Sequence, residues 1–140
     1  MTHLLNFNIM KQHIIAITSA GLGGLLSFLY GDITPALQVL VAMMAIDFVT
    51  GTLNGVLNKK LNSKICYKGI VKKINILCLV AVGHFIDQAT GINSIQNIVV
   101  FFYLANEGIS IIENAAKAGL PIPQKVKDVL EQLKEEGGQR

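Results

Sequence analysis

Polar residues that could do chemistry interrupt an apolar helix pattern at residues 101–114, FFYLANEGISIIEN. They recur at three- and four-residue steps and therefore share one side of a helix. They are Asn106, Glu107, Ser110, Glu113 and Asn114. In water this would be an ordinary amphipathic helix. In a membrane the acids are costly unless they face protein or an aqueous path, where they could also carry ions or protons.

A further acid, Asp47, lies near the middle of the apolar run at residues 36–57. Steps of four and three residues lead from Asp47 to Gly51 and Asn54, so the three share a helix face. Gly51 and Gly55 also form a GxxxG pair, which permits close helix packing in lipid but is weak evidence alone. We expect this face to meet protein or water rather than lipid.

The remaining candidates for chemistry are isolated. His84 and Asp87 are three residues apart on one helix face, where a hydrogen-bonded structural pair is favoured over a proton relay. Cys66 and Cys78 show no metal-ligand or redox spacing. Because no nucleophile lies beside a base and no metal cluster stands out, the sequence predicts neither an enzyme nor a cofactor or metal site.

The composition favours a membrane as the solvent around these residues. The chain of 140 residues is 51% hydrophobic and only 15% charged, with a mean hydropathy of +0.51. Four apolar runs are long enough, or nearly so, to cross a bilayer core of about 30 Å. They occupy residues 14–30, 36–57, 70–89 and 94–116. The fourth run contains the polar stripe, so it inserts favourably only if that stripe faces other helices or water.

The predicted fold is therefore all-α, with helical hairpins in a membrane. It has four transmembrane helices, or three if the short first run or the polar fourth run does not cross. The bundle would occupy residues 14–116, after a short segment at residues 1–13. Residues 117–140 contain a GLPIP helix stop followed by an amphipathic, mixed-charge pattern, which predicts a C-terminal helix outside the bilayer, in the cytoplasm.

A lysine-rich stretch between the second and third runs predicts the topology. Its lysines, at residues 58–73 without any acid, are Lys59, Lys60, Lys64, Lys68, Lys72 and Lys73. Since no arginine or aromatic ladder accompanies them, a cytoplasmic loop that follows the positive-inside rule is favoured over a nucleic-acid site. Both termini would then lie in the cytoplasm, and Lys72 and Lys73 would have to snorkel to the inner surface.

A set of residues spread over roughly 36–133 carries a family resemblance. They are Asp47, Thr50 and Gly51; Ser63, Lys64, Lys68, Gly69, Ile70 and Lys73; Asp87; Tyr103, Asn106, Glu107, Ser110, Ile111, Glu113 and Asn114; and Gly119, Pro121 and Pro123. With this pattern the chain resembles the small phage holins, a group that includes clostridial toxin-secretion holins and lysis proteins from phages of Gram-positive hosts. The NEGISIIEN stretch with the following PIP is the most specific part. Such holins are commonly described with three spans, one fewer than we predict.

The resemblance implies a pore-forming protein without catalytic residues. Holins assemble into homo-oligomers in the lipid bilayer of the bacterial cytoplasmic membrane and permeabilise it at a set time. A cytoplasmic endolysin, a murein hydrolase, then reaches the cell wall without required contact with the holin, and some relatives are linked to toxin export. On this interpretation the residues expected at an oligomer interface or pore are Asp47, Gly51, Asn54, Asn106, Glu107, Ser110, Glu113 and Asn114. By depth, Glu113 could meet Lys72 or Lys73.

Two other classes of protein stay open. One is a small oligomeric channel or transporter that uses the intramembrane acids for ions or protons. The other is a soluble helical interaction protein, in which the apolar runs would form the core.

Overall fold

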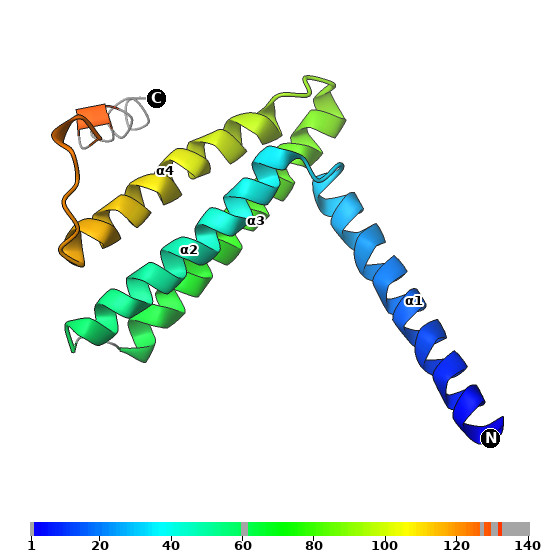
Figure 1. Cartoon of the computed structure of the whole chain (residues 1–140). Helices are drawn as coiled ribbons and strands as arrows, with labels where there is room; N and C mark the ends of the chain where they lie inside the picture. The colour runs from blue at the N-terminus through cyan, green and yellow to red at the C-terminus, as the bar shows by residue number, and fades with distance from the viewer. Residues whose placement is uncertain (1, 60–61, 127, 130–131, 133–140) are drawn as a thin grey trace. The chain divides into compact units, whose positions relative to one another are not determined.

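The computed structural model describes residues 2–59, 62–126, 128–129 and 132, and in this part of the chain the long elements are four α-helices. These are α1 (Thr2–Tyr30), α2 (Pro35–Leu57), α3 (Ser63–Thr90) and α4 (Ile95–Lys117), shown in Figure 1. Each contains a segment long and apolar enough to span a membrane. The predicted all-α fold with four such helices is confirmed. The chain divides into two units, Met1–Ile33 and Thr34–Arg140, which are described separately.

The first unit is built on α1, whose candidate membrane span is Met10–Tyr30. Residues 10–28 are exposed throughout, including large apolar side chains such as Ile17 at 72% and Phe28 at 65%. A helix with exposed apolar residues on every side is unstable in water, but it satisfies its backbone hydrogen bonds internally and suits lipid.

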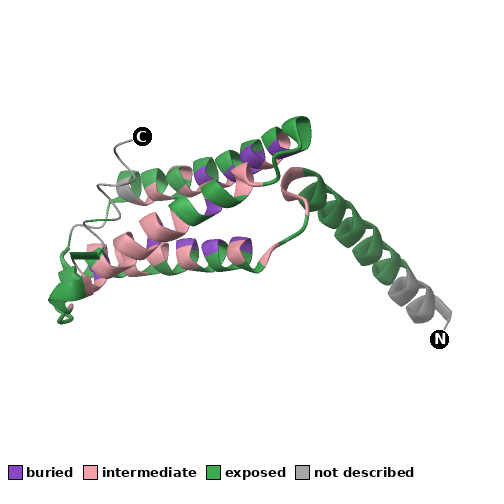
Figure 2. Ribbon diagram, turned by 90° about the horizontal axis from the view of Figure 1, so that it is seen from above, coloured by how far each residue is buried: buried purple, intermediate pink, exposed green. Residues whose placement is uncertain are grey.

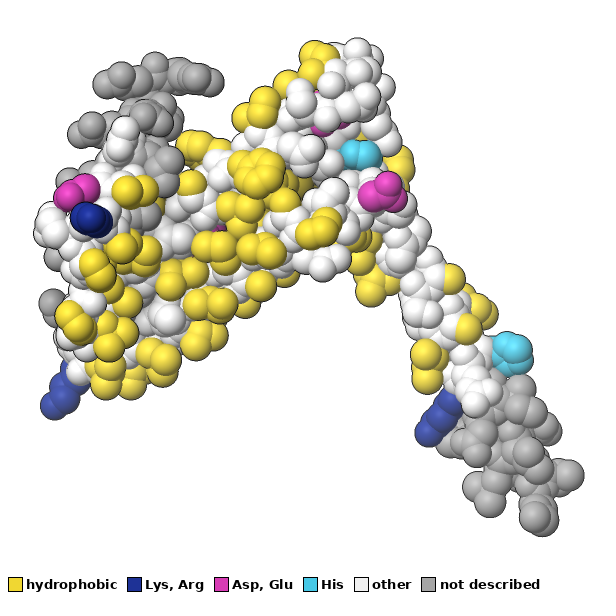
Figure 3. All heavy atoms as spheres, turned by 45° about the horizontal axis from the view of Figure 1, so that its top comes forward, with side chains coloured by type: hydrophobic (Ala, Val, Ile, Leu, Met, Phe, Trp, Pro, Cys, Tyr) yellow, Lys and Arg dark blue, Asp and Glu magenta, His cyan; other side chains and the backbone are white. Residues whose placement is uncertain are grey.

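In the second unit α4 packs against both α2 and α3 (Figure 1). The buried positions follow the facing sides of the helices, as the purple ribbon in Figure 2 shows. The buried apolar residues are Leu37, Leu40, Met44, Ile76, Val80, Ala81 and Val100. The outer faces are apolar as well, and in Figure 3 hydrophobic side chains cover much of the visible surface of these helices. This distribution fits a protein dissolved in lipid and argues against the soluble alternative.

Local sequence signals explain where α2 and α3 begin. Thr34 caps α2, since its Oγ1 accepts a hydrogen bond from Leu37 N at 3.2 Å, and Pro35 occupies the first helical turn as predicted. Asn62 caps α3 by accepting from Lys64 N at 2.9 Å. Because of this cap, α3 starts at Ser63, well before the predicted span at residues 70–89. The predicted lysine loop is thus mostly helix, and only its first part connects α2 to α3.

The turn between α3 and α4 depends on Gly91, which ends α3 with φ at 72° and donates its N–H to Asp87 O at 2.8 Å. This left-handed conformation suits glycine. The amphipathic helix predicted within residues 117–140 is described only in part, with helical backbone at residues 124–126, 128–129 and 132. The rest of that prediction lies outside the described residues.

Close packing of α3 on α4 requires a glycine at residue 83. A Cβ added to Gly83 would lie 2.9 Å from Gln96 Cα and 3.2 Å from Gln96 N, and both of these atoms are backbone. The variant Gly83→Ala should therefore lower the free energy of unfolding by about 1 to 3 kcal/mol, measured by loss of helicity on titration of detergent-solubilised protein with denaturing detergent. Gly24→Ala is the matched control, because a Cβ there meets nothing within 4 Å. Equal stability of the two variants would contradict the close approach.

Candidate functional site

Three charged side chains, one from each helix of the second unit, meet inside the bundle. The ammonium group of Lys73 on α3 donates to Asp47 Oδ2 on α2 at 2.8 Å and also to Glu107 Oε2 on α4. Their side chains are 13% exposed for Lys73 and Asp47, and 0% for Glu107. We call Asp47, Lys73 and Glu107 the charge cluster. It links the three helices through a single cation.

The charge cluster holds two acids around one buried lysine. Each charge would be expensive alone in a bundle surrounded by lipid, so Lys73 and the two carboxylates depend on one another. Glu107 Oε1 is buried and has no hydrogen-bond partner among the described residues, and Lys72 Nζ lies 3.7 Å from it. That separation exceeds hydrogen-bond distance, so one carboxylate oxygen is only electrostatically compensated.

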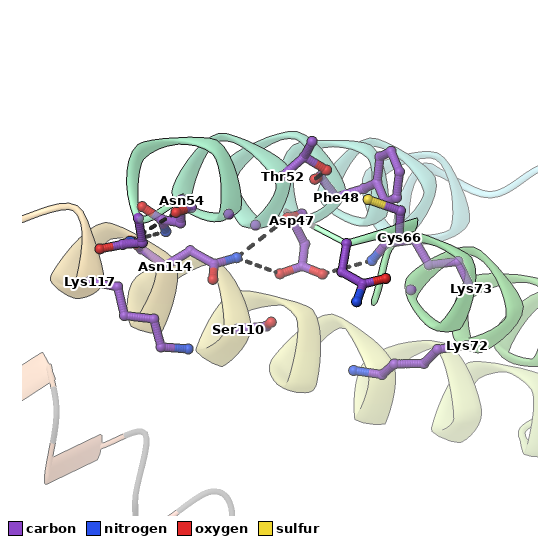
Figure 4. A pocket seen from close by; sticks show the side chains of 15 residues that line it. Asp47, Phe48, Thr52, Asn54, Cys66, Lys72, Lys73, Ser110, Asn114 and Lys117 are labelled. Atoms are coloured by element: carbon purple, nitrogen blue, oxygen red, sulfur yellow. Dashed lines mark hydrogen bonds and ion pairs between the residues drawn. The ribbon is translucent and has the colours of Figure 1, made fainter. Parts of the chain in front are cut away.

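Amide side chains extend the polar contacts from the cluster toward the ends of α2 and α4. Asn114 Nδ2 donates to Asp47 Oδ1 at 3.1 Å and to Thr50 Oγ1 at 3.2 Å, and Figure 4 shows it pointing at Asp47. Asn54 Nδ2 in turn donates to Asn114 O at 2.7 Å. Gly51 makes room for this contact, because a Cβ there would lie 3.4 Å from Asn114 Nδ2. The polar faces of the second and fourth runs thus meet each other within one chain.

Of the remaining stripe residues on α4, Ser110 adds a side-chain hydrogen bond to the Asp47 carboxylate. Asn106 and Ser110 are half-buried, and Ser110 lines a cavity beside Asp47 (Figure 4). The expectation that Glu113 meets Lys72 or Lys73 is wrong: Glu113 is 54% exposed and lies 4.0 Å from Lys117 on its own helix. Glu113 is only four residues from the end of α4, whereas Lys73 lies about 15 Å into α3 by helix rise, so their levels differ.

The lysines expected to set topology fall into different environments. Lys59, Lys64 and Lys68 are exposed, Lys72 has a side chain 50% exposed, and Lys60 lies outside the described residues. Lys73 does not snorkel to the surface as expected. Its ammonium turns inward because two acids at the same level compensate it better than partial exposure would.

At the opposite end of α3, Asp87 organises the turn into α4. Its Oδ1 accepts from Ser94 N at 3.0 Å and Ile95 N at 2.8 Å, and its Oδ2 accepts from Gln96 N at 2.9 Å. The expected hydrogen bond between His84 and Asp87 is wrong, since His84 Nε2 instead lies 3.0 Å from Gln88 Nε2. The cause is the N-terminus of α4, whose first amides need acceptors that Ser94 does not supply through its side chain.

Comparison with known proteins places this architecture in a family. Residues 24–135 match the family model described as the bacteriophage holin family. The chain belongs to the bacteriophage holin family. Together with four apolar helices, this indicates a holin-like membrane protein, and the holin family is not an enzyme family. No solved structure matches the chain significantly.

Several curated relatives from Gram-positive bacteria are similar to this holin-family chain over most of its length. The uncharacterized protein Lin0175 of Listeria innocua is 40% identical over 118 residues, which cover 84% of each chain. An uncharacterized 14.9 kDa protein of Clostridium perfringens, from the nagH 3′ region, is 38% identical over 80% of this chain and 86% of its own length. The uncharacterized protein YtkC of Bacillus subtilis is 32% identical over 92% of both.

The charge cluster, its amide contacts and the α3–α4 turn contain residues whose roles the sequence does not predict. The sequence predicts Lys73 as a residue that sets the membrane topology, and Thr50 only as part of the family resemblance. It predicts His84, not the amides at the start of α4, as the partner of Asp87. A count of charges within the apolar runs could have revealed Lys73, because two acids near mid-span need a cation and Lys73 extends furthest into the third run. Among the described residues no group of three His, Cys, Asp or Glu could hold a metal ion.

Two isosteric substitutions on α4 separate the buried acid from the exposed one. Glu107→Gln removes a buried charge that contacts Lys73 and should lower the free energy of unfolding by about 1 to 3 kcal/mol. Glu113→Gln is the matched control and should change it by less than about 0.5 kcal/mol, because Glu113 is mostly exposed. Denaturing-detergent titrations of both variants provide the measurement. Equal shifts would contradict the different placement of the two carboxylates.

Proposed function

We propose that this chain is a holin that oligomerises in the bacterial cytoplasmic membrane, forms a lesion or pore there, and so releases an endolysin or a toxin and triggers lysis of the host cell. The observation that carries the proposal is the match of residues 24–135 to the bacteriophage holin family. The helices add support, because all four candidate spans keep large apolar side chains on their outer faces.

The proposed orientation places the lysine-bearing ends of α2 and α3 in the cytoplasm. Lys59, Lys64 and Lys68 are exposed there, and short connections at residues 31–34 and 91–94 contain no lysine or arginine. By the positive-inside rule, both termini would then be cytoplasmic if all four helices cross.

The proposed oligomer uses side chains that contacts within one chain leave accessible. Asn106, Ser110 and Glu113 on α4 are partly or mostly exposed, so a neighbouring copy or a water-filled lumen could face them. Asp47, Glu107 and Asn114 are engaged within the chain, so we propose that they shape the bundle that presents this surface. Gly51 and Asn54 support the same intrachain contacts.

Co-expression tests the proposed function. A culture producing this chain together with a cytoplasmic murein hydrolase should lose optical density abruptly, and hydrolase activity should appear in the medium at that time. A culture producing the hydrolase alone should stay turbid, and one producing this chain alone should lose viability without wall degradation. Retention of the hydrolase in the cytoplasm of intact co-expressing cells would contradict a holin.

A proton or ion channel is the second candidate, and Glu107 favours it. The unbonded, buried Oε1 of this acid could accept a proton within the bundle. A channel or transporter would give steady ion flux in living cells, whereas a holin would kill them.

A further inference from the structure

A cavity of about 630 Å³ lies between α2, α3 and α4 beside the charge cluster. It reaches from Asp47 to Asn58 and Asn62, the capping residues at the ends of α2 and α3, and includes Lys117 at the end of α4. The lack of a side chain at Gly51 and at Gly69 helps to leave this space open. The cavity therefore extends from the middle of α2 to the lysine-bearing end of the bundle, where the candidate spans of α2 and α4 end.

The lining of the cavity is positive. Three lysines, Lys72, Lys73 and Lys117, line it with a single acid, Asp47. Two further acids lie beside these lysines without lining the cavity: Glu107 is next to Lys72 and Lys73, and Glu113 lies 4.0 Å from Lys117. An anion inside the cavity would face three ammonium groups and one carboxylate, so the lining itself attracts it.

Two of these ammonium groups keep hydrogen-bond donors for a ligand. Lys72 Nζ is 3.7 Å from Glu107 Oε1, and Lys117 Nζ is 4.0 Å from Glu113 Oε2, so neither pair is at hydrogen-bond distance. In Figure 4 their amino ends extend toward each other along one side of the cavity. The Asn62 oxygen accepts from Lys64 N, which leaves the Asn62 amide nitrogen as a neutral donor at the same cavity.

We propose that this cavity is a binding site for anionic phosphate groups, with Lys72 as a donor in its inner part and Lys117 and Asn62 as donors near the ends of α4 and α3. Basic pockets between transmembrane helices at one membrane face have the charge and depth that anionic headgroups require. The same chemistry would accept an anionic phospholipid headgroup or free phosphate. Binding here goes beyond the proposed lytic function and does not depend on lesion formation.

Lipid retention tests the site. The full chain, purified in mild detergent and mixed with phosphatidylglycerol or phosphatidylcholine, is measured by native mass spectrometry for the lipid that stays bound. Phosphatidylglycerol should be retained preferentially, and the variant Lys72→Gln with Lys117→Gln should retain it at least about tenfold less. The matched control, Lys64→Gln with Lys68→Gln, removes the same charge from exposed positions on α3 and should retain it like wild type. Equal losses in both double variants, or no preference over phosphatidylcholine, would overturn the proposal.

The native thiol of Cys66 gives a second readout that leaves the charges intact. Cys66 lines the cavity, so in a Cys78→Ser chain its reaction with a maleimide should slow in nanodiscs that contain phosphatidylglycerol and not in phosphatidylcholine alone. Inorganic phosphate that slows labelling in phosphatidylcholine nanodiscs would identify free phosphate as the source. If labelling of Cys66 is equally slow under every condition, protein side chains fill the cavity. If it is equally fast under every condition, no ligand occupies the cavity. Either result would overturn the proposed binding site.

Discussion

Replacing Lys73 with methionine should lower the free energy of unfolding by about 3 to 5 kcal/mol, the largest effect that we expect from a single substitution. Methionine replaces the apolar stem of the lysine side chain but removes the cation that contacts Asp47 and Glu107. Two carboxylates would then remain in the bundle, with only the half-exposed Lys72 beside Glu107 to compensate them. Denaturing-detergent titration of the purified variant, followed by helicity, measures the loss.

Two companion variants show whether the loss comes from the charge cluster. Lys72→Met changes the adjacent lysine, whose side chain is 50% exposed. It should lower the free energy of unfolding by less than about 1 kcal/mol. Combining Lys73→Met with Asp47→Asn and Glu107→Gln removes all three charges, and should recover most of the stability because no uncompensated charge stays buried. Equal effects of Lys72→Met and Lys73→Met would contradict a buried cluster, as would a triple variant no more stable than Lys73→Met.

Replacing Asp87 with alanine should lower the free energy of unfolding by about 2 kcal/mol and destabilise the first turn of α4. The carboxylate accepts hydrogen bonds from three successive amides, at Ser94, Ile95 and Gln96, and alanine leaves all three without that acceptor. Amide hydrogen exchange at these three residues should accelerate, while exchange at the middle of α4 should change much less. Asp87→Asn retains one carbonyl acceptor and should give an intermediate effect.

Asp32 provides the control for this prediction. It is an exposed acid in the connection between α1 and α2, residues 31–34, which also contains no lysine or arginine. Asp32→Ala should leave both stability and the exchange of the α4 amides unchanged. If Asp87→Ala leaves the exchange of those amides at wild-type rates, the capping role is wrong.

Sequence periodicity identified the polar faces but not their partners. The spacing of Asp47, Gly51 and Asn54, and of the stripe on the fourth run, predicts which side of each helix avoids lipid. In the structure these two faces do meet, through Asn114 and its contacts with Asp47 and Asn54. Which residues on neighbouring helices lie opposite each other depends on the relative position of the helices along their axes. Periodicity within one helix does not contain that information.

Lys73 and Glu113 illustrate how this limit affects individual assignments. A lysine near the edge of an apolar run normally snorkels, so sequence reasoning assigned Lys73 to the membrane surface. Because Asn62 caps α3, the helix begins two turns before the predicted span. Lys73 therefore lies opposite Glu107 and not opposite Glu113. Likewise Asp87 was assigned to a neighbour on its own helix, because its amide partners become close only after Gly91 turns the chain.

The time course of membrane potential in single bacterial cells tests the holin account most directly. Cells carry a potential-sensitive dye and express this chain without a murein hydrolase. We expect the potential to hold after induction and then to collapse abruptly and completely, with loss of viability. A partial and steady change of potential in cells that continue to grow would contradict the account and would favour a channel or transporter.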